Sequence, residues 1–203
     1  WIDPYQARVL RKTKHPVYDF LFTYYSYRPS WLRRWHPGLG VTLRGDDADA
    51  FLQRREYRRT NYGVAVDPQT LAVERRRAVE RVKELLTTTA IRPALFSCFG
   101  LHEWAMVYRQ SPDQIRHNAH PLRFAPDGIA QVVEACGVCC THFDAFRFFT
   151  KEARPLNRYQ PERYTSVSLE QRGCLHANMD LYKWAYKLAP FTSGELVADC
   201  FDL

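Results

Sequence analysis

Residues 174–188, CLHANMDLYKWAYKL, place aliphatic and aromatic side chains at the spacing of an α-helix. This pattern predicts a helix that has most of its surface against a protein core. Two polar residues, His176 and Asp180, nevertheless lie four positions apart on one face of that helix. The segment therefore constrains the fold twice, because it requires a helical core and also requires partners for two polar side chains inside that core.

Helical patterns recur along the chain. The clearest start is Asp67, a predicted N-cap that is followed by Pro68 at the first helical position and by apolar residues at helical spacing up to Leu86. Residues 138–149 fit either a strand or a helix. We expect further helices over 15–27, around 31–35, within 44–57, over 93–109, over 127–134 and over 193–201, with mainly loop over 110–127 and 151–173. The predicted fold class is mainly α, a single compact helical domain over 1–203 with one or two short strands.

Composition narrows the class of protein. Hydrophobic residues make up 46% and charged residues 25% of the 203 positions, as in ordinary folded domains, and no apolar run is long enough for a transmembrane helix. The chain is neither short nor loop-rich, so its six cysteines indicate buried thiols and an intracellular setting, cytoplasmic or organellar. It begins with Trp1 rather than Met and ends at Leu203 without a helix stop signal, so we expect processing or truncation at both ends.

Arginine accounts for most of a net charge of +7. Basic clusters attract anionic partners such as nucleic acid or another polyanion, although a solvated basic face has the same appearance in a sequence. The residues that we assign to such a partner are Arg33, Arg34, Arg54, Arg55, Arg58 and Arg59. Binding of this kind is expected to weaken as the salt concentration rises.

Four pairs of histidine and carboxylate lie in or beside apolar segments. The pairs are His15–Asp19, His102–Glu103, His142–Asp144 and His176–Asp180. Each pair can form a local hydrogen bond, share a metal ion, or combine an acid–base group with the residue that orients it. Together they indicate a common polar site, in which Glu103 is the first candidate for the catalytic acid or base and Asp180 the second, while His102, His142 and His176 orient or polarise. Dispersed structural bonding is the alternative.

The helix over 95–109 is apolar on most faces, so we predict that it is central and that Trp104 is largely buried. Cys136 to His142 resembles one half of a metal-binding knuckle, but a closed zinc site needs a second matched half, for which Cys174 and His176 are the nearest candidates. Walker, Rossmann and Gly-x-Ser-x-Gly signatures are absent.

Four stretches as a set resemble a known family: HPVYDFLFTYYSYRPSWLRRWHPG, FSCFGLHEWAMVYR, CTHFDAFRFFT and CLHANMDLYKWAYKL. They are similar to actinobacterial and plastid-type proteins commonly labelled 3-methyladenine DNA glycosylase, and the similarity covers most of the chain. The resemblance implies N-glycosidic hydrolysis of damaged purines in DNA. That reaction needs a basic face, an aromatic pocket for the flipped base and a carboxylate.

Three functions follow as alternatives. The leading one is an enzyme whose pocket is built from the histidines and carboxylates. The second is a non-catalytic structural or adaptor subunit of a larger assembly, such as an organellar one, with protein partners on its exposed surface. The third is a helical protein that binds a metal or a tetrapyrrole through the same histidines, and the sequence does not identify the cofactor.

Overall fold

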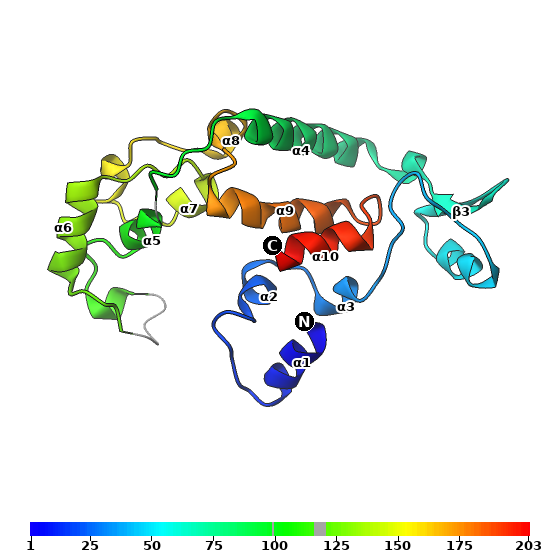
Figure 1. Ribbon diagram of the computed structural model, residues 1–203, viewed down its shortest axis with the longest axis horizontal. Coiled ribbons are helices and arrows are strands. Elements are labelled where there is room, and N and C mark those ends of the chain that lie inside the picture. Colours follow the sequence, from blue (N-terminus) through cyan, green and yellow to red (C-terminus); the bar gives the residue numbers. More distant parts are fainter. Residues whose placement is uncertain (99, 116–120) are drawn as a thin grey trace. The chain divides into compact units, whose positions relative to one another are not determined.

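The computed structural model describes residues 1–98, 100–115 and 121–203, and helices predominate in it (Figure 1). About 53% of the chain is helical and 6% lies in strands, which confirms the prediction of a mainly α fold. The contacts group into two compact units, of which the first comprises 1–81 with 179–203 and the second comprises 82–178. The single domain expected over 1–203 stays a prediction. None of the described helices combines the length and the apolar character that crossing a membrane requires.

Three short helices begin the first unit: α1 (Ile2–Leu10), α2 (Phe20–Tyr24) and α3 (Pro29–Leu32). The helix predicted over 15–27 is therefore too long. The backbone is already extended at Tyr25. In extended backbone, side chains two positions apart point to the same side, so Tyr25 and Tyr27 can both enter one aromatic core.

A small antiparallel sheet follows, in the order β1–β3–β2, from β1 (Thr42–Leu43), β2 (Tyr57–Thr60) and β3 (Gly63–Val66). Val64 pairs with Leu43 on one side and with Arg59 on the other. The tight turn into β3 requires glycine, because Gly63 has a φ of 139° and an added Cβ would lie 2.1 Å from the carbonyl oxygen of Leu43. The 3-10 helix η1 (Asp46–Gln53) packs beside this sheet, where sequence predicts a loop and a short α-helix.

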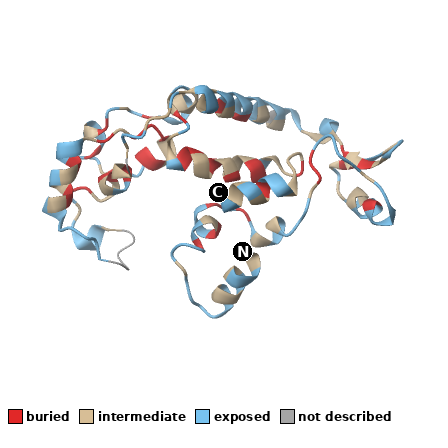
Figure 2. Cartoon of the chain, viewed as in Figure 1, coloured by how far each residue is buried: buried red, intermediate tan, exposed pale blue. Residues whose placement is uncertain are grey.

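The last two helices, α9 (Leu175–Leu188) and α10 (Gly194–Asp202), match the predicted ranges closely. Ser193 caps α10 by accepting a hydrogen bond from the backbone of Leu196. From residue 179 onward α9 belongs to the first unit, whose core consists mainly of tyrosines. Much of α9 is buried in Figure 2. The core of the first unit contains Tyr25, Tyr27, Tyr182, Ala185, Tyr186 and Val197.

Helix α4 (Val73–Ile91) begins later than predicted. Asp67 does accept a hydrogen bond from the backbone of Gln69, but the helix that it starts is the short 3-10 helix η2 (Pro68–Thr70). The extended backbone at Leu71 then separates η2 from α4. The predicted capping chemistry is therefore present, although it caps a different helix.

The second unit contains short helices joined by long connections. They are α5 (Leu101–Met106), η3 (Pro112–Gln114), α6 (Pro126–Cys136), α7 (Phe143–Phe146), η4 (Arg154–Leu156), η5 (Arg163–Thr165) and α8 (Ser166–Leu169). The helix predicted over 93–109 and the loop predicted over 110–127 include residues 99 and 116–120, which lie outside the described part. Within the described residues, the prediction of one long helix over 93–109 is wrong, because α5 covers only six residues.

The core of the second unit forms around α5, α6 and α7, with Ala105, Val133 and Ala145 fully buried. Trp104 is half-buried and packs against this core and against Phe124, with ring centroids 5.4 Å apart. Trp104 therefore lies at the edge of this core, and the prediction that it is largely buried is met in part. Small Ala105, rather than the indole of Trp104, occupies the densest part of the core.

Candidate metal centre

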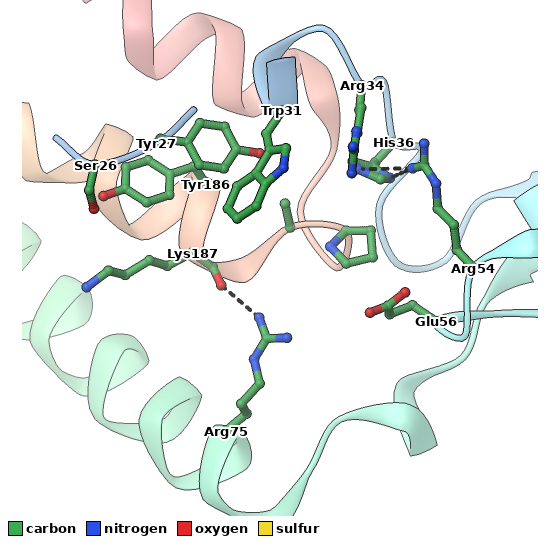
Figure 3. Close-up of a pocket in the computed structure, with 12 residues that line it drawn as sticks. Ser26, Tyr27, Trp31, Arg34, His36, Arg54, Glu56, Arg75, Tyr186 and Lys187 are labelled. Carbon is green, nitrogen blue, oxygen red and sulfur yellow. Dashed lines mark hydrogen bonds between the residues drawn. The ribbon is translucent and has the colours of Figure 1, made fainter. Parts of the chain in front are cut away.

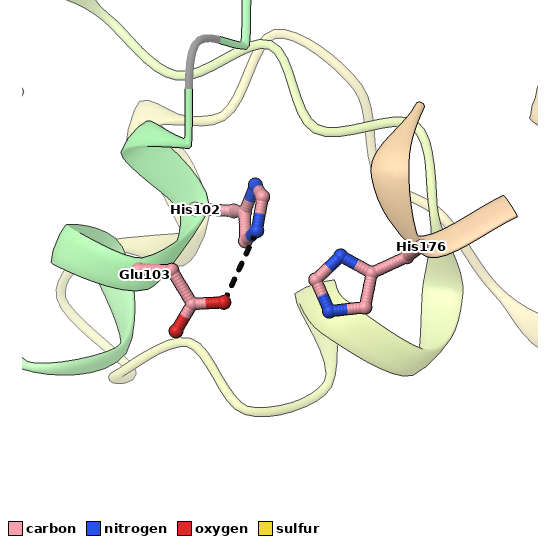
Figure 4. A group of neighbouring side chains, drawn as sticks. All are labelled: His102, Glu103 and His176. Carbon is pink, nitrogen blue, oxygen red and sulfur yellow. Dashed lines mark ion pairs between the residues drawn. The ribbon is translucent and has the colours of Figure 1, made fainter. Parts of the chain in front are cut away.

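Two short stretches of helix in the second unit bring three ligand-type side chains together (Figure 4). Gly100, in the left-handed conformation with a φ of 78°, precedes α5 and sets His102 and Glu103 in its first turn. His176 is the second residue of α9. Sequence separation between the two histidines is large, so only the fold places them side by side.

The three side chains have the spacing of a small metal site. One nitrogen of each histidine and one oxygen of Glu103 all lie within 4.8 Å of one another. Nε2 of His102 is 3.2 Å from Oε1 of Glu103. Two ligands with bonds of about 2.1 Å to a tetrahedral ion are about 3.4 Å apart. The His102–Glu103 spacing therefore fits a shared ion as it stands, and His176 needs a small movement.

Burial differs among the three residues in a way that matters for chemistry. His102 and His176 are 5% and 8% exposed, whereas the side chain of Glu103 is 62% exposed. Packed surroundings hold the two imidazoles, and the carboxylate lies at the solvent boundary. An ion bound here would be fixed from one side and accessible to water from the other.

Cys98 contacts the other nitrogen of His102, with Sγ 2.9 Å from Nδ1. Burial by itself would lower the pKa of His102, but the hydrogen bonds to Cys98 and Glu103 outweigh it and raise that pKa to about 9. Burial raises the pKa of the Cys98 thiol, yet the contact with His102 brings the net pKa below its ordinary value. The ring is thereby fixed in orientation, as histidine ligands of metals usually are by a group on the second nitrogen.

A third histidine, His142, lies against His176. The His142 ring stacks on that of His176, with centroids 5.5 Å apart, and His142 is 1% exposed. Its Nε2 is 3.8 Å from Oε1 of Glu170, itself buried. The rings of His102 and His176 meet edge to face at 4.7 Å. The three histidines assigned to the site therefore lie in a row of ring contacts, with His176 in the middle, and their shared function stays a prediction.

Asp180 has different neighbours. The Tyr25 hydroxyl donates to Oδ1 of Asp180 at 2.9 Å, and the Lys183 ammonium pairs with Oδ2. Burial, and then the negative charge of Asp180, raises the pKa of Tyr25. These contacts lie in the aromatic core of the first unit, so they support a structural role for Asp180. Its predicted catalytic role stays a prediction.

The remaining predicted pairs form local bonds. Asp19 accepts from the backbone N–H of His15 at 2.8 Å and from the Arg8 guanidinium at 2.8 Å, and this guanidinium lowers the pKa of Asp19. Asp144 forms an ion pair with Arg147 at 3.2 Å, as expected for a helical arrangement of that segment.

The six arginines assigned to an anionic partner divide into two sets. Four of them pair with carboxylates: Arg33 with Asp3, Arg55 with Glu56, Arg58 with Asp67, and Arg59 with Asp49. Among the described residues, no ion pair is formed by Arg34 or Arg54, and both line a cavity in the first unit. The polyanion-binding face stays a prediction, but its free charge is smaller than the sequence indicates.

Two residues of the site, Cys98 and Glu170, are not assigned to it by the sequence analysis. Cys98 precedes His102 by four positions, a Cys-x-x-x-His spacing that could have indicated the contact. Glu170 lies in a segment of low periodicity, and nothing in the sequence links it to His142. The convergence depends on connections between short helices, which local patterns do not specify.

Comparisons with protein families, with curated proteins and with solved structures give no match to this chain.

Proposed function

We propose that the protein is a metal-dependent hydrolase in which His102, Glu103 and His176 bind a divalent transition-metal ion of the Zn²⁺ type. The observation that carries the proposal is the grouping of their ligand atoms within 4.8 Å. Two imidazoles and one carboxylate are a ligand set of catalytic zinc sites, which keep one position for water. Such an ion supplies an activated water molecule near neutral pH.

The residues of the site would have different roles in binding the ion. Buried His102 and His176 hold the ion, and Cys98 keeps the ring of His102 turned so that Nε2 faces Glu103. Glu103 completes the ligand set and, being exposed, leaves that side of the site accessible to substrate. Buried His142, which lies 3.8 Å from Glu170, stacks on the ring of His176.

Zinc titration of the metal-free, reduced protein tests the proposal. We expect one tight site in isothermal titration calorimetry, and His176→Asn or His102→Asn should weaken Zn²⁺ binding by about 100-fold or more. Loss of a residue that only orients a ligand already costs 10- to 100-fold. His15→Asn is the matched control, because an asparagine oxygen can accept the local backbone bonds that Nδ1 of His15 accepts.

Binding that is equally tight in wild type and in the His176→Asn variant would contradict the proposal, as would the absence of a tight site in folded wild-type protein. Circular dichroism must show that each variant is folded. For the substrate, the resemblance to proteins labelled 3-methyladenine DNA glycosylase makes alkylated DNA the first choice. The proposal predicts that any release of damaged purine depends on the metal and is lost in the His176→Asn variant.

A further inference from the structure

The first unit contains a cavity of about 410 Å³ that has no part in the metal chemistry (Figure 3). Its volume falls within the range of small-molecule sites. In Figure 3 the rings of Tyr27, Tyr186 and Trp31 lie on one side, and the side chains of Arg34 and Arg54 lie on another. The cavity therefore offers two kinds of surface to a ligand, one aromatic and one cationic.

The cationic surface has unused hydrogen-bonding capacity. Arg34, Arg54 and Arg75 line the cavity, and none of them forms an ion pair with a carboxylate among the described residues. A guanidinium has five N–H donors. The described hydrogen bonds run from one NH2 nitrogen of Arg75 to the Lys187 carbonyl and from NH1 of Arg54 to the His36 ring. Donors remain for a bound anion, and the planar guanidinium group can form two parallel hydrogen bonds to a phosphate.

The arginines at the cavity differ from the other clustered arginines in having no carboxylate partner among the described residues. Arg33, Arg55, Arg58 and Arg59 each pair with a carboxylate. Arg54 and Arg75 are half-buried at the cavity without such a partner. A half-buried cation is costly unless an anion compensates for its lost hydration, so these positions favour a bound anion more than a solvated basic surface.

The titratable side chains around the cavity do not neutralise the charge of its arginines. Burial, and then the charge of Arg54, lowers the pKa of His36 to about 4, so the ring that contacts Arg54 is neutral at pH 7. Glu56, the one carboxylate among the described residues that line the cavity, pairs with exposed Arg55 at 3.3 Å. Glu56 can still accept hydrogen bonds from hydroxyl or amino groups of a ligand.

The aromatic surface is ordered for stacking. Tyr27 stacks on Tyr186 with centroids 4.4 Å apart, and the rings of Tyr27 and Trp31 meet edge to face with centroids 5.6 Å apart. Trp31 is 40% exposed, so part of its ring is available to a ligand. Stacking on a protein aromatic side chain contributes about 1–3 kcal/mol for a nucleobase.

From these two surfaces we propose that the cavity binds a small ligand carrying both a phosphate group and an aromatic ring, of the nucleoside monophosphate class. Arg34, Arg54 and Arg75 contact the phosphate. Trp31 stacks on the base, and Glu56 accepts from hydroxyl groups of the sugar.

Calorimetric titration with adenosine monophosphate tests this proposal, with adenosine and inorganic phosphate as partial ligands. We expect both partial ligands to bind at least about 10-fold more weakly than the nucleotide, because each lacks one of the two contacts. Arg34→Gln and Arg75→Gln should each weaken nucleotide binding by about 10-fold or more, the expected loss of a charged hydrogen bond. Arg59→Gln is the matched control in the same unit, since Arg59 pairs with Asp49 outside the cavity.

Three results would overturn the proposal. One is no binding of the nucleotide at about 1 mM, the weak end of the range of useful affinities. Another is inorganic phosphate binding as tightly as the nucleotide, which would remove the aromatic contact. The third is unchanged nucleotide binding in folded Arg34→Gln and Arg75→Gln variants, which would locate the bound nucleotide elsewhere.

Discussion

Replacement of Tyr182 by alanine is expected to lower the free energy of unfolding by about 3–5 kcal/mol, the usual cost of removing a large aromatic side chain from a core. Tyr182 is 1% exposed. Its ring meets those of Tyr25, Tyr186 and Phe201 edge to face at 5.1 to 5.6 Å. Alanine would leave a cavity that these rings cannot fill without losing contacts with one another. Urea unfolding monitored by circular dichroism measures the change.

Tyr182→Phe is the matched control for that experiment. Phenylalanine keeps the ring and all of its edge-to-face contacts, so the loss should stay below about 1.5 kcal/mol, as for volume-conserving core substitutions. If Tyr182→Ala costs less than about 1 kcal/mol, the tyrosine cluster is not the stabilising core of the first unit. The described packing around α9 would then be wrong.

Replacement of Lys183 by methionine is the second large effect, with an expected loss of about 3–5 kcal/mol at neutral pH. The side chains of Lys183 and Asp180 are 14% and 6% exposed, and the two form an ion pair. Breaking a buried ion pair on one side leaves the other charge poorly compensated, which is costly. Methionine is unbranched and matches the lysine side chain as far as Cε, so the substitution removes mainly the ammonium group.

Lys187→Met provides the control on the same helix. Lys187 is exposed, and Arg75 contacts it through its backbone carbonyl, which the substitution leaves in place. Its cost should be within about 0.5 kcal/mol, the usual range for surface positions. Equal losses in the two variants would show that the charge of Asp180 does not need Lys183.

The same reasoning separates a structural from a catalytic Asp180. Asp180→Asn should reduce stability, because the contacts with Tyr25 and Lys183 depend on its negative charge. If Asp180 is structural, Zn²⁺ affinity should stay unchanged in the folded variant. A loss of Zn²⁺ binding without a loss of stability would restore Asp180 to the catalytic site.

Long, strongly periodic segments are the part of the fold that sequence predicts best. α9 and α10 appear where expected, because each has enough turns for the apolar spacing to be distinctive. The strands β2 and β3 have four residues each, too few for their alternation to be recognised. α5 is cut short at Val107 and preceded by the left-handed turn at Gly100, although the surrounding residues are apolar enough for a longer helix.

Part of the candidate site can also be predicted from the sequence. Histidines and carboxylates within apolar segments must find partners there, and His102, His142 and His176 do meet. Asp180 lies about one turn, roughly 6 Å, further along α9 than His176. That distance is enough to place its carboxylate among the tyrosines of the first unit. Sequence spacing shows that two residues share a helix face, but it does not show which neighbours cover each end of that face.

X-ray absorption spectroscopy of the zinc-loaded protein tests the central claim most directly, because it identifies the atoms bound to the ion. We expect a shell of nitrogen and oxygen ligands at about 2.0–2.1 Å, with the multiple-scattering signal of two imidazoles. His176→Asn should remove one imidazole from that signal. A shell of sulfur ligands at about 2.3 Å would contradict the account, because it would assign the ion to cysteines rather than to His102, Glu103 and His176.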